Sequence, residues 1–211
     1  MSRLLYNRRE AVAHLKSRCG QLGRLIEDSG PLKLRVTKDA DLFNALSAAI
    51  IYQQLSGKAA ATIHGRFKAL FHEGLPGAEE ASGLSHEVLR GAGLSNNKAL
   101  AIHDLAKKSV DGTLLPARRL RRLDDDAVVR KLCQVRGIGP WTAQMYLIFN
   151  LGRPDVMPAT DLGIQKGVQW VYKRQLLPAP DEVLEITRHL APYRSAASWY
   201  FWLAADTGLI S

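Results

Sequence analysis

Two glycines flank a single isoleucine in the middle of the chain, in the sequence Val135-Arg136-Gly137-Ile138-Gly139-Pro140-Trp141. Before it, Asp124-Asp125-Asp126 followed by Arg130-Lys131 matches acidic and basic charges to the two ends of a helix dipole. Glycine permits positive φ and close backbone approach, and Pro140 fits the first turn of a following helix, where its missing N–H costs little. The stretch therefore predicts two helices joined by a glycine hairpin over residues 124–150.

Apolar residues elsewhere recur at helical spacings. Between residues 7 and 28 they are Val12, Leu15, Leu22, Leu25 and Ile26. Asp39-Ala40-Asp41 is expected to open a long helix that breaks at Ser56-Gly57, and Ser85 and Ser95 are expected to cap two further helices. Alternation typical of strands is nearly absent, which predicts an all-α fold.

Charge and cysteine content narrow the class of protein. The formal net charge is +9, which favours a polyanionic partner through long-range attraction and counterion release. Only Cys19 and Cys133 are present, too few for a disulfide framework or a four-cysteine iron–sulfur cluster. The sequence has no secretory signal and no apolar run long enough to span a membrane, so we expect a reduced intracellular protein.

The start of the helix after the hairpin is a candidate phosphate site. Its first N–H groups have no acceptor within the helix and lie at the positive end of the dipole. Ile138 is expected to pack inward and hold the turn. On these residues alone, a plain helical hairpin with a glycine connection remains an alternative.

A carboxylate follows the hairpin at the end of a proline-containing segment, Met157-Pro158-Ala159-Thr160-Asp161. Asp161 is expected at the start of another helix. Either Asp161 or Thr160 could cap that helix, and a cap at Thr160 would leave the Asp161 carboxylate for chemistry.

The hairpin string, with Pro154, Pro158 and Asp161 after it, resembles the helix-hairpin-helix (HhH-GPD) DNA glycosylase superfamily. The branch that it resembles most is the 3-methyladenine DNA glycosylase II (AlkA-like) branch, in a compact form without an N-terminal β domain. Three further blocks of the sequence carry the same resemblance, namely residues 50–60, 93–106 and 191–200. Together the blocks span nearly the whole chain.

The resemblance implies an all-α, two-lobed glycosylase fold with a central helix-hairpin-helix and a cleft between the lobes. We expect a single domain over residues 1–211. One lobe is expected over about 38–150, including the hairpin at 124–150, and the other over 1–37 plus 151–211.

The implied function is that of a monofunctional DNA glycosylase of base excision repair, which flips and excises alkylated purines such as 3-methyladenine and 7-methylguanine. Asp161 would be the catalytic carboxylate, stabilising an oxocarbenium-like transition state and helping to orient water. Relatives that also cut the backbone carry a lysine nucleophile at the position of Trp141, so no lyase activity is expected. The expected partner is double-stranded DNA with alkylated bases, the protein is expected to be monomeric, and no membrane partner is expected.

The resemblance also assigns the base pocket and the wedge. Trp141 and Tyr52 would hold the flipped, often cationic base through their aromatic faces. Gln54 and Leu55 are the two candidates for the side chain that fills the vacated place in the base stack. The segment around Lys98 is expected to complete the DNA surface.

In this family the hairpin binds phosphate through backbone amides, which here are those of Gly137, Gly139 and Trp141. Its backbone carbonyls bind a monovalent cation, K⁺ or Na⁺, and the corresponding residues are Cys133, Val135 and Ile138. No other cofactor is implied, and the cysteine count leaves no place for an iron–sulfur cluster.

Two other functions remain open. The chain could be a non-catalytic helix-hairpin-helix scaffold that binds DNA, or a glycosylase for other lesions such as deaminated purines. The basic run Arg118-Arg119-Leu120-Arg121-Arg122 is interpreted as a solvated face, and Trp170, Trp199 and Trp202 as core residues.

Overall fold

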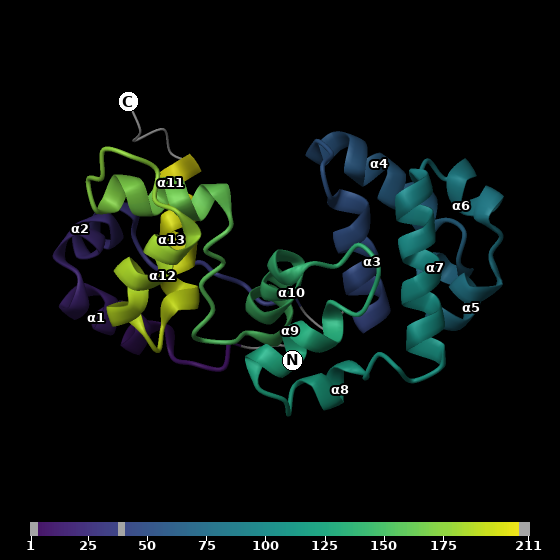
Figure 1. Cartoon of the computed structure of the whole chain (residues 1–211), viewed down its shortest axis with the longest axis horizontal. Helices are drawn as coiled ribbons and strands as arrows, with labels where there is room; N and C mark the ends of the chain where they lie inside the picture. The colour runs from purple at the N-terminus through teal and green to yellow at the C-terminus, as the bar shows by residue number, and fades with distance from the viewer. Residues whose placement is uncertain (1–3, 38–40, 207–211) are drawn as a thin grey trace. The chain divides into compact units, whose positions relative to one another are not determined.

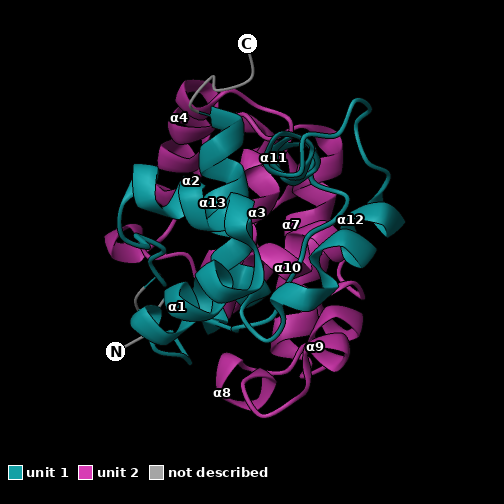
Figure 2. Cartoon of the chain, turned by 90° about the vertical axis from the view of Figure 1, so that its left-hand side faces the viewer, with its two compact units in different colours: residues 1–38, 147–211 teal, residues 39–146 magenta. Residues whose placement is uncertain are grey.

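The computed structural model describes residues 4–37 and 41–206, and within these ranges every regular element is a helix and there is no strand. The all-α prediction is confirmed. The chain divides into two compact units, residues 1–38 with 147–211 (unit 1) and residues 39–146 (unit 2) (Figure 2). The later boundary falls after residue 146, whereas the lobes were expected to divide after residue 150. None of the helices in the described ranges is both long and apolar enough to cross a membrane.

Unit 1 combines the two ends of the chain (Figure 1). Its elements are α1 (Arg8–Arg18), α2 (Gly20–Ser29), the π-helical turn η2 (Leu147–Leu151), α11 (Leu162–Val171), α12 (Pro180–Thr187), the 3-10 turn η3 (Arg188–Leu190) and α13 (Arg194–Asp206). Its core lies between α11 and α13, where Ile164, Val168 and Phe201 are fully buried. Tyr200, also fully buried, donates its hydroxyl to the carbonyl of Gly30 at the end of α2 over 3.2 Å.

Gly167 allows α11 and α13 to pack at close range. A Cβ at this position would lie 2.1 Å from the carbonyl oxygen of Phe201, which is far inside van der Waals contact. Only glycine therefore fits here without moving a backbone. Helix α11 begins at Leu162, directly after its N-cap residue Asp161.

Unit 2 is built around a long central helix, α7. Its elements are α3 (Leu42–Tyr52), α4 (Gly57–Lys68), the 3-10 turn η1 (His72–Gly74), α5 (Ala78–Gly83), α6 (His86–Gly91), α7 (Asn96–Val110), α8 (Ala117–Leu120), α9 (Asp125–Leu132) and α10 (Pro140–Tyr146). The apolar face of α7, including Ile102 and Leu105, is buried in the unit. Ser85 and Ser95 accept hydrogen bonds from backbone N–H groups at the starts of α6 and α7, as the sequence predicted.

The expected long helix over residues 39–56 is shorter than predicted. Asp41 caps α3 by accepting from the N–H of Phe43, and the helix ends at Tyr52. Ser56 then caps α4 by accepting from the N–H of Ala59, so residues 53–56 form a loop between two helices and the expected break is present. Asp39 and Ala40 lie outside the described residues.

The glycine hairpin joins α9 and α10 as predicted. Asp124 caps α9 through its Oδ1, which accepts from the N–H of Ala127, and Pro140 is the first residue of α10. Ile138, between the two glycines, is buried. The predicted two-helix hairpin is therefore present, and its turn is held by an apolar side chain.

Candidate functional site

Asp161 lies at the N-terminus of α11 and is its N-cap. Its Oδ1 accepts a hydrogen bond of 3.0 Å from the backbone N–H of Ile164, while Thr160 is exposed. The alternative in which Thr160 caps the helix is therefore wrong. The cap fixes the carboxylate relative to α11, and the side chain stays partly exposed.

Trp202 on α13 holds the same carboxylate oxygen. Its indole Nε1 donates to Asp161 Oδ1 over 2.9 Å, and its ring stacks on Phe149 with a centroid distance of 5.7 Å. A Cβ on Gly163 would meet Trp202 Cδ1 at 2.9 Å, so glycine leaves room for the indole. The interpretation of Trp202 as a core residue is wrong, because it is partly exposed and contacts the candidate catalytic group.

The other two tryptophans read as core are also only partly buried. Trp170 lines a cavity of about 650 Å³ between α2 and α11, together with residues such as Arg24 and Lys166. Trp199 packs its ring edge-to-face against Tyr200, with centroids 4.8 Å apart. Trp170 lies on α11 and Trp199 on α13, and the interpretation of both as core residues is wrong because their rings stay partly exposed.

Hydrogen bonds connect the proline-containing segment before Asp161 to the start of α13. Asp155 receives two side-chain hydrogen bonds from Arg194, from Nε at 2.7 Å and from Nη2 at 2.9 Å, and Asp155 raises the pKa of the guanidinium. The buried hydroxyl of Ser195 accepts from the N–H of Val156, and that of Ser198 donates to the carbonyl of Val156. These contacts define the path of the chain into Asp161.

Two of the three backbone N–H groups that are expected to bind phosphate belong to the glycines of the hairpin. Among the described residues, the N–H groups of Gly137 and Gly139 have no hydrogen-bond acceptor. Gly137 has a φ of 77°, whereas a Cβ on Gly139 would meet open space. The two glycines therefore act differently: Gly137 makes the turn, and Gly139 keeps the surface beside the amides uncrowded.

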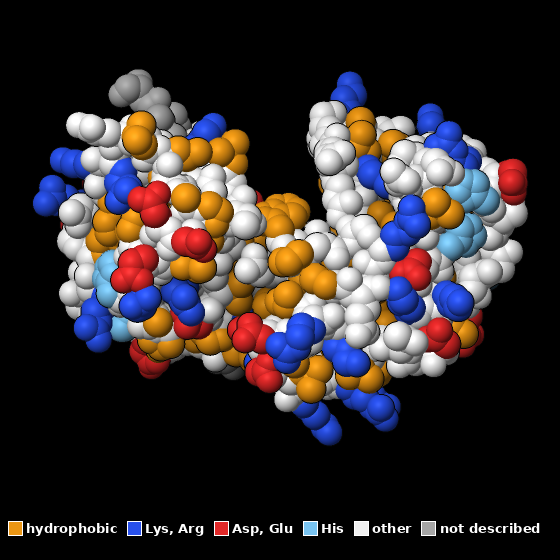
Figure 3. Space-filling model, in the orientation of Figure 1, with side chains coloured by type: hydrophobic (Ala, Val, Ile, Leu, Met, Phe, Trp, Pro, Cys, Tyr) orange, Lys and Arg blue, Asp and Glu red, His pale blue; other side chains and the backbone are white. Residues whose placement is uncertain are grey.

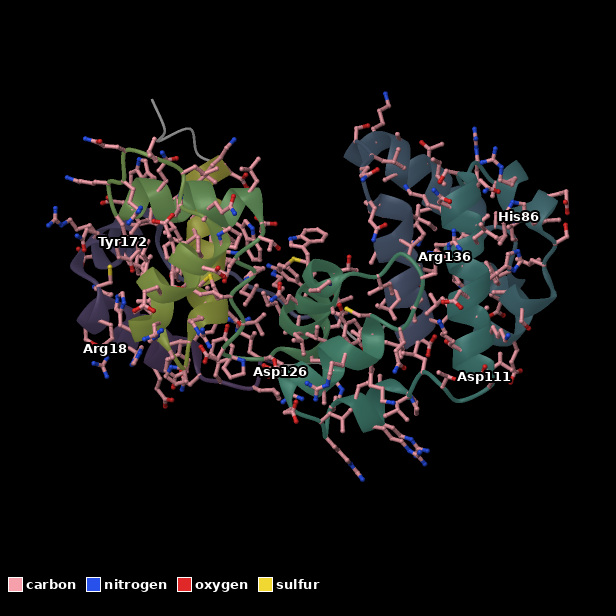
Figure 4. The ribbon with its side chains drawn as sticks, viewed as in Figure 1. Arg18, His86, Asp111, Asp126, Arg136 and Tyr172 are labelled. Carbon is pink, nitrogen blue, oxygen red and sulfur yellow. The ribbon has the colours of Figure 1, made fainter. Side chains whose placement is uncertain are left out.

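Helix α7 supports the hairpin from one side. Asp104 Oδ2 accepts a 2.7 Å hydrogen bond from the N–H of Arg136 and forms an ion pair with Lys108 Nζ at 2.7 Å. Lys108 Nζ also donates to the carbonyl of Gln134. Burial by itself would raise the pKa of Asp104, but the hydrogen bonds and the nearby ammonium hold it below its ordinary value. Figure 4 shows Arg136 on this loop beside α7.

The carbonyls assigned to a monovalent cation suit that purpose. The carbonyl oxygens of Cys133 and Ile138 accept no hydrogen bond from the described part of the chain, and that of Val135 accepts one, from the N–H of Ile138 at 3.1 Å. A carbonyl has two lone pairs, so all three retain capacity for a cation. Burial raises the pKa of the Cys133 thiol, which favours its neutral form.

The two aromatic candidates for the base pocket, Trp141 and Tyr52, are 41% and 43% exposed, respectively. Trp141 lies in the first turn of α10, and Tyr52 is the last residue of α3. Tyr52 packs edge-to-face with His64 at 5.7 Å, and burial lowers the pKa of this histidine. Both residues therefore expose a large part of an aromatic ring.

Gln54 and Leu55 form the exposed tip of the loop between α3 and α4. Gln54 has a φ of 55°, in the left-handed region, and Leu55 is 37% exposed. The loop borders a cavity of about 200 Å³ whose other walls include Gly93, Ser95 and Lys98. The two sequence blocks around residues 50–60 and 93–98 thus meet in unit 2.

Lys98 does not lie on the surface as an unpaired cation. Its Nζ donates to the carbonyls of Ile51 at 2.7 Å and of Gln53 at 2.8 Å, and burial lowers its pKa. The Gln53 side chain in turn donates to the carbonyl of Gly137 at 2.9 Å. Sequence reasoning missed Gln53 and Trp202, because each acts on a residue far away in the chain and neither has a local signature.

The structure divides the predicted residues between the units. Asp161 belongs to unit 1, whereas Tyr52, Gln54, Leu55 and the hairpin belong to unit 2. The arginine run forms α8 and the turn after it, with Leu120 buried and the four arginines exposed. Figure 3 shows blue Lys and Arg side chains gathered at this end of unit 2.

The chain was compared with known families and curated proteins. The model of the family described as "HhH-GPD superfamily base excision DNA repair protein" matches residues 47–192. DNA-3-methyladenine glycosylase 1 of Schizosaccharomyces pombe is 36% identical over 161 residues, which cover 76% of this chain and 71% of that protein. The putative DNA-3-methyladenine glycosylase YfjP of Bacillus subtilis is 34% identical over 174 residues, 80% of this chain and 60% of that protein.

Solved structures show the same fold. The S. pombe 3-methyladenine DNA glycosylase Mag1, in complex with abasic DNA, matches with a TM-score of 0.82 at 33% identity, over 92% of this chain and 95% of that chain. The DNA-3-methyladenine glycosidase of Bacillus halodurans matches with a TM-score of 0.86 at 33% identity, over 95% and 91%.

Proposed function

Since the chain belongs to the HhH-GPD superfamily of base excision DNA repair proteins, we propose that it is a monofunctional DNA glycosylase that flips and excises alkylated purines. The observation that carries this proposal is the Asp161 carboxylate, fixed by Ile164 and Trp202 at the end of the proline-containing segment. The names of the similar proteins support 3-methyladenine-type lesions as substrates.

Cleavage of the N-glycosidic bond develops positive charge on the deoxyribose as the base departs. A carboxylate near C1′ stabilises that cation and orients the attacking water, and Asp161 is the residue proposed for both tasks. The products are a free base and an abasic site. Alkylated purines often carry positive charge, so they leave readily and need little acid catalysis.

The partner is double-stranded DNA containing an alkylated base, bound by a monomer. Backbone amides of Gly137, Gly139 and Trp141 bind a phosphate, and the net charge of +9 favours association with the duplex. K⁺ or Na⁺ held by the carbonyls of Cys133, Val135 and Ile138 would add positive charge beside that phosphate.

The base pocket is formed by Trp141 and Tyr52, whose exposed rings offer electron-rich faces to a cationic base. Gln54 or Leu55 fills the place that the flipped nucleotide leaves in the stack. Because Trp141 stands where lyases of the family carry lysine, no Schiff base forms. Borohydride added during the reaction should therefore trap no covalent protein–DNA adduct.

Asp161→Asn tests the catalytic assignment. Asparagine is an equally good helix cap and retains an acceptor for Ile164 and Trp202, so the variant removes the charge while keeping these contacts. Single-turnover excision of 7-methylguanine or 3-methyladenine should fall by about 10²–10³-fold. A variant that excises as fast as the parent would show that another group performs the chemistry.

An excision panel distinguishes the two alternatives. A parent protein that binds methylated duplex DNA and releases no base is a scaffold. One that releases hypoxanthine and spares methylated purines acts on deaminated lesions instead.

A further inference from the structure

Gln54, in the loop between α3 and α4, has a backbone conformation that is uncommon for a residue other than glycine. Gln54 has a φ of 55°, a region that residues other than glycine rarely occupy, and it is exposed at the tip of the loop. Such a conformation persists only where surrounding contacts impose it. The contacts that surround Gln54 therefore determine whether its side chain is presented in one fixed place.

Lys98 provides the first of these contacts. Its Nζ donates to the carbonyls of Ile51 and Gln53, which belong to the last turn of α3 and the loop residue after it. Terminal carbonyls of a helix lack partners within the helix, so the partly buried ammonium of Lys98 satisfies them and ends α3 at a defined point. Because Lys98 Nζ makes both of these contacts, we assign Lys98 to supporting the loop and not to binding a DNA phosphate.

Gln53 provides the second contact, to the hairpin. Its Nε2 donates to the carbonyl of Gly137 at 2.9 Å and lies 3.4 Å from the hydroxyl oxygen of Thr142 in α10. Gly137 is the left-handed residue of the hairpin, and its own N–H has no acceptor among the described residues. One side-chain amide therefore joins the loop that carries Gln54 to the turn that presents the phosphate-binding amides.

We propose that Gln53 and Lys98 are positioning residues that fasten the Gln54 loop to the hairpin, so that a hairpin bound to phosphate holds Gln54 rigidly against the base stack. The inference rests on the proposed glycosylase function. It assigns the wedge to Gln54, whose backbone the two fastening residues fix. A wedge that is already in place lowers the cost of keeping the nucleotide extruded, because no loop has to be ordered at that moment.

A positioning role for Gln53 and Lys98 predicts that the excision rate depends on the cost of base flipping, whereas a role in general stability does not. Extruding a base costs most in a fully paired duplex and least where the base is already unpaired. Loss of the fastening contacts should therefore slow excision from a paired duplex much more than excision of the same lesion placed opposite an abasic site.

The test compares single-turnover excision of 7-methylguanine in these two duplexes by the parent and by Gln53→Ala. With a paired lesion the variant should be about tenfold slower, the effect expected for one lost hydrogen bond to the hairpin. With the lesion opposite an abasic site it should stay within about threefold of the parent. Should Gln53→Ala not fold, Gln53→Met keeps the volume and removes the donor, and the same two rates are measured.

Matched control variants show whether a slower excision comes from the lost hydrogen bonds or from a general change in charge or stability. Lys98→Met should show the same substrate-dependent loss, whereas Lys107→Met, which removes an exposed charge from the same helix, should not. Gln175→Ala removes an exposed glutamine from the loop after α11 and should match the parent on both duplexes.

If the parent protein excises the base, two results would overturn the positioning role without affecting the proposed function. One is an equal loss of excision rate by Gln53→Ala on both duplexes, and the other is no loss of rate on either duplex. A parent that releases no base from either duplex would overturn the proposed function, and the positioning role with it.

Discussion

Trp202 donates its indole Nε1–H to Oδ1 of Asp161 over 2.9 Å. This hydrogen bond joins the C-terminal half of α13 to the N-cap residue of α11. The same oxygen accepts from the N–H of Ile164, so two donors from different helices fix one atom of the carboxylate. Stacking of the indole on Phe149 fixes the donor in turn. The carboxylate is thus oriented by tertiary structure as well as by its own helix.

Trp202→Phe should slow excision while leaving the protein folded. The phenyl ring retains most of the stacking on Phe149 but cannot donate to Asp161, so Oδ1 of the carboxylate loses an orienting hydrogen bond. A hydrogen bond to a charged group contributes about 1.5–3 kcal/mol, so the single-turnover rate on 7-methylguanine DNA should fall by about 10–100-fold. Trp199→Phe on the same helix is the control, and equal rates for the two variants would contradict the orienting role.

Gly167→Ala should destabilise unit 1. The new Cβ would lie 2.1 Å from the carbonyl oxygen of Phe201, and relieving that overlap requires α11 and α13 to separate. Urea denaturation should give a loss of about 1–3 kcal/mol in the free energy of unfolding. Gly65→Ala in α4, where a Cβ meets open space, should be neutral or stabilising by up to about 1 kcal/mol. A stable Gly167→Ala variant would mean that the two helices are less closely packed than described.

Gly139→Ala should weaken DNA binding without affecting stability. Its Cβ meets nothing in the protein, but it would project into the space beside the amides proposed to bind phosphate. Fluorescence anisotropy with a duplex containing an abasic-site analogue should show about tenfold weaker binding, with an unchanged melting temperature. Gly137→Ala should instead lower the melting temperature, because it combines a φ of 77° with a contact to Ala101 at 3.3 Å. Unchanged DNA affinity of Gly139→Ala would argue against the phosphate site.

Asp104→Asn should destabilise the hairpin in a pH-dependent manner. Because the folded-state pKa of Asp104 is lowered, its ionised form stabilises the fold above the unfolded pKa of about 3.9. That contribution is lost as the pH falls through the lower, folded-state value. Urea denaturation at pH 7 should show the variant about 1–2 kcal/mol less stable than the parent. The difference should shrink below about pH 4, and a difference that stays constant down to pH 2 would exclude the ionised carboxylate as its cause.

Residues whose partners lie within one turn were the predictable part of this molecule. Ser85, Ser95 and Pro140 each occupy the helix-start position that their chemistry favours, and the acidic Asp124 caps α9. The serine and aspartate caps each join residues three apart, so the sequence pattern contains both partners. The end of α3 was misjudged because Ser56-Gly57 is the first helix-breaking pair after Tyr52, and nothing local marks the point where Lys98 caps the helix.

The sequence by itself determined the all-α class, the glycine hairpin with Ile138 inside it, and the family resemblance that singled out Asp161 and Trp141. Helical periodicity and capping chemistry act over a few residues, so they can be read directly from the chain. Only the tertiary structure brought Trp202 to Asp161 and Gln53 to Gly137, across 41 and 84 positions. Those pairings depend on how helices pack, and close packing at Gly163 and Gly167 sets distances that no local pattern encodes.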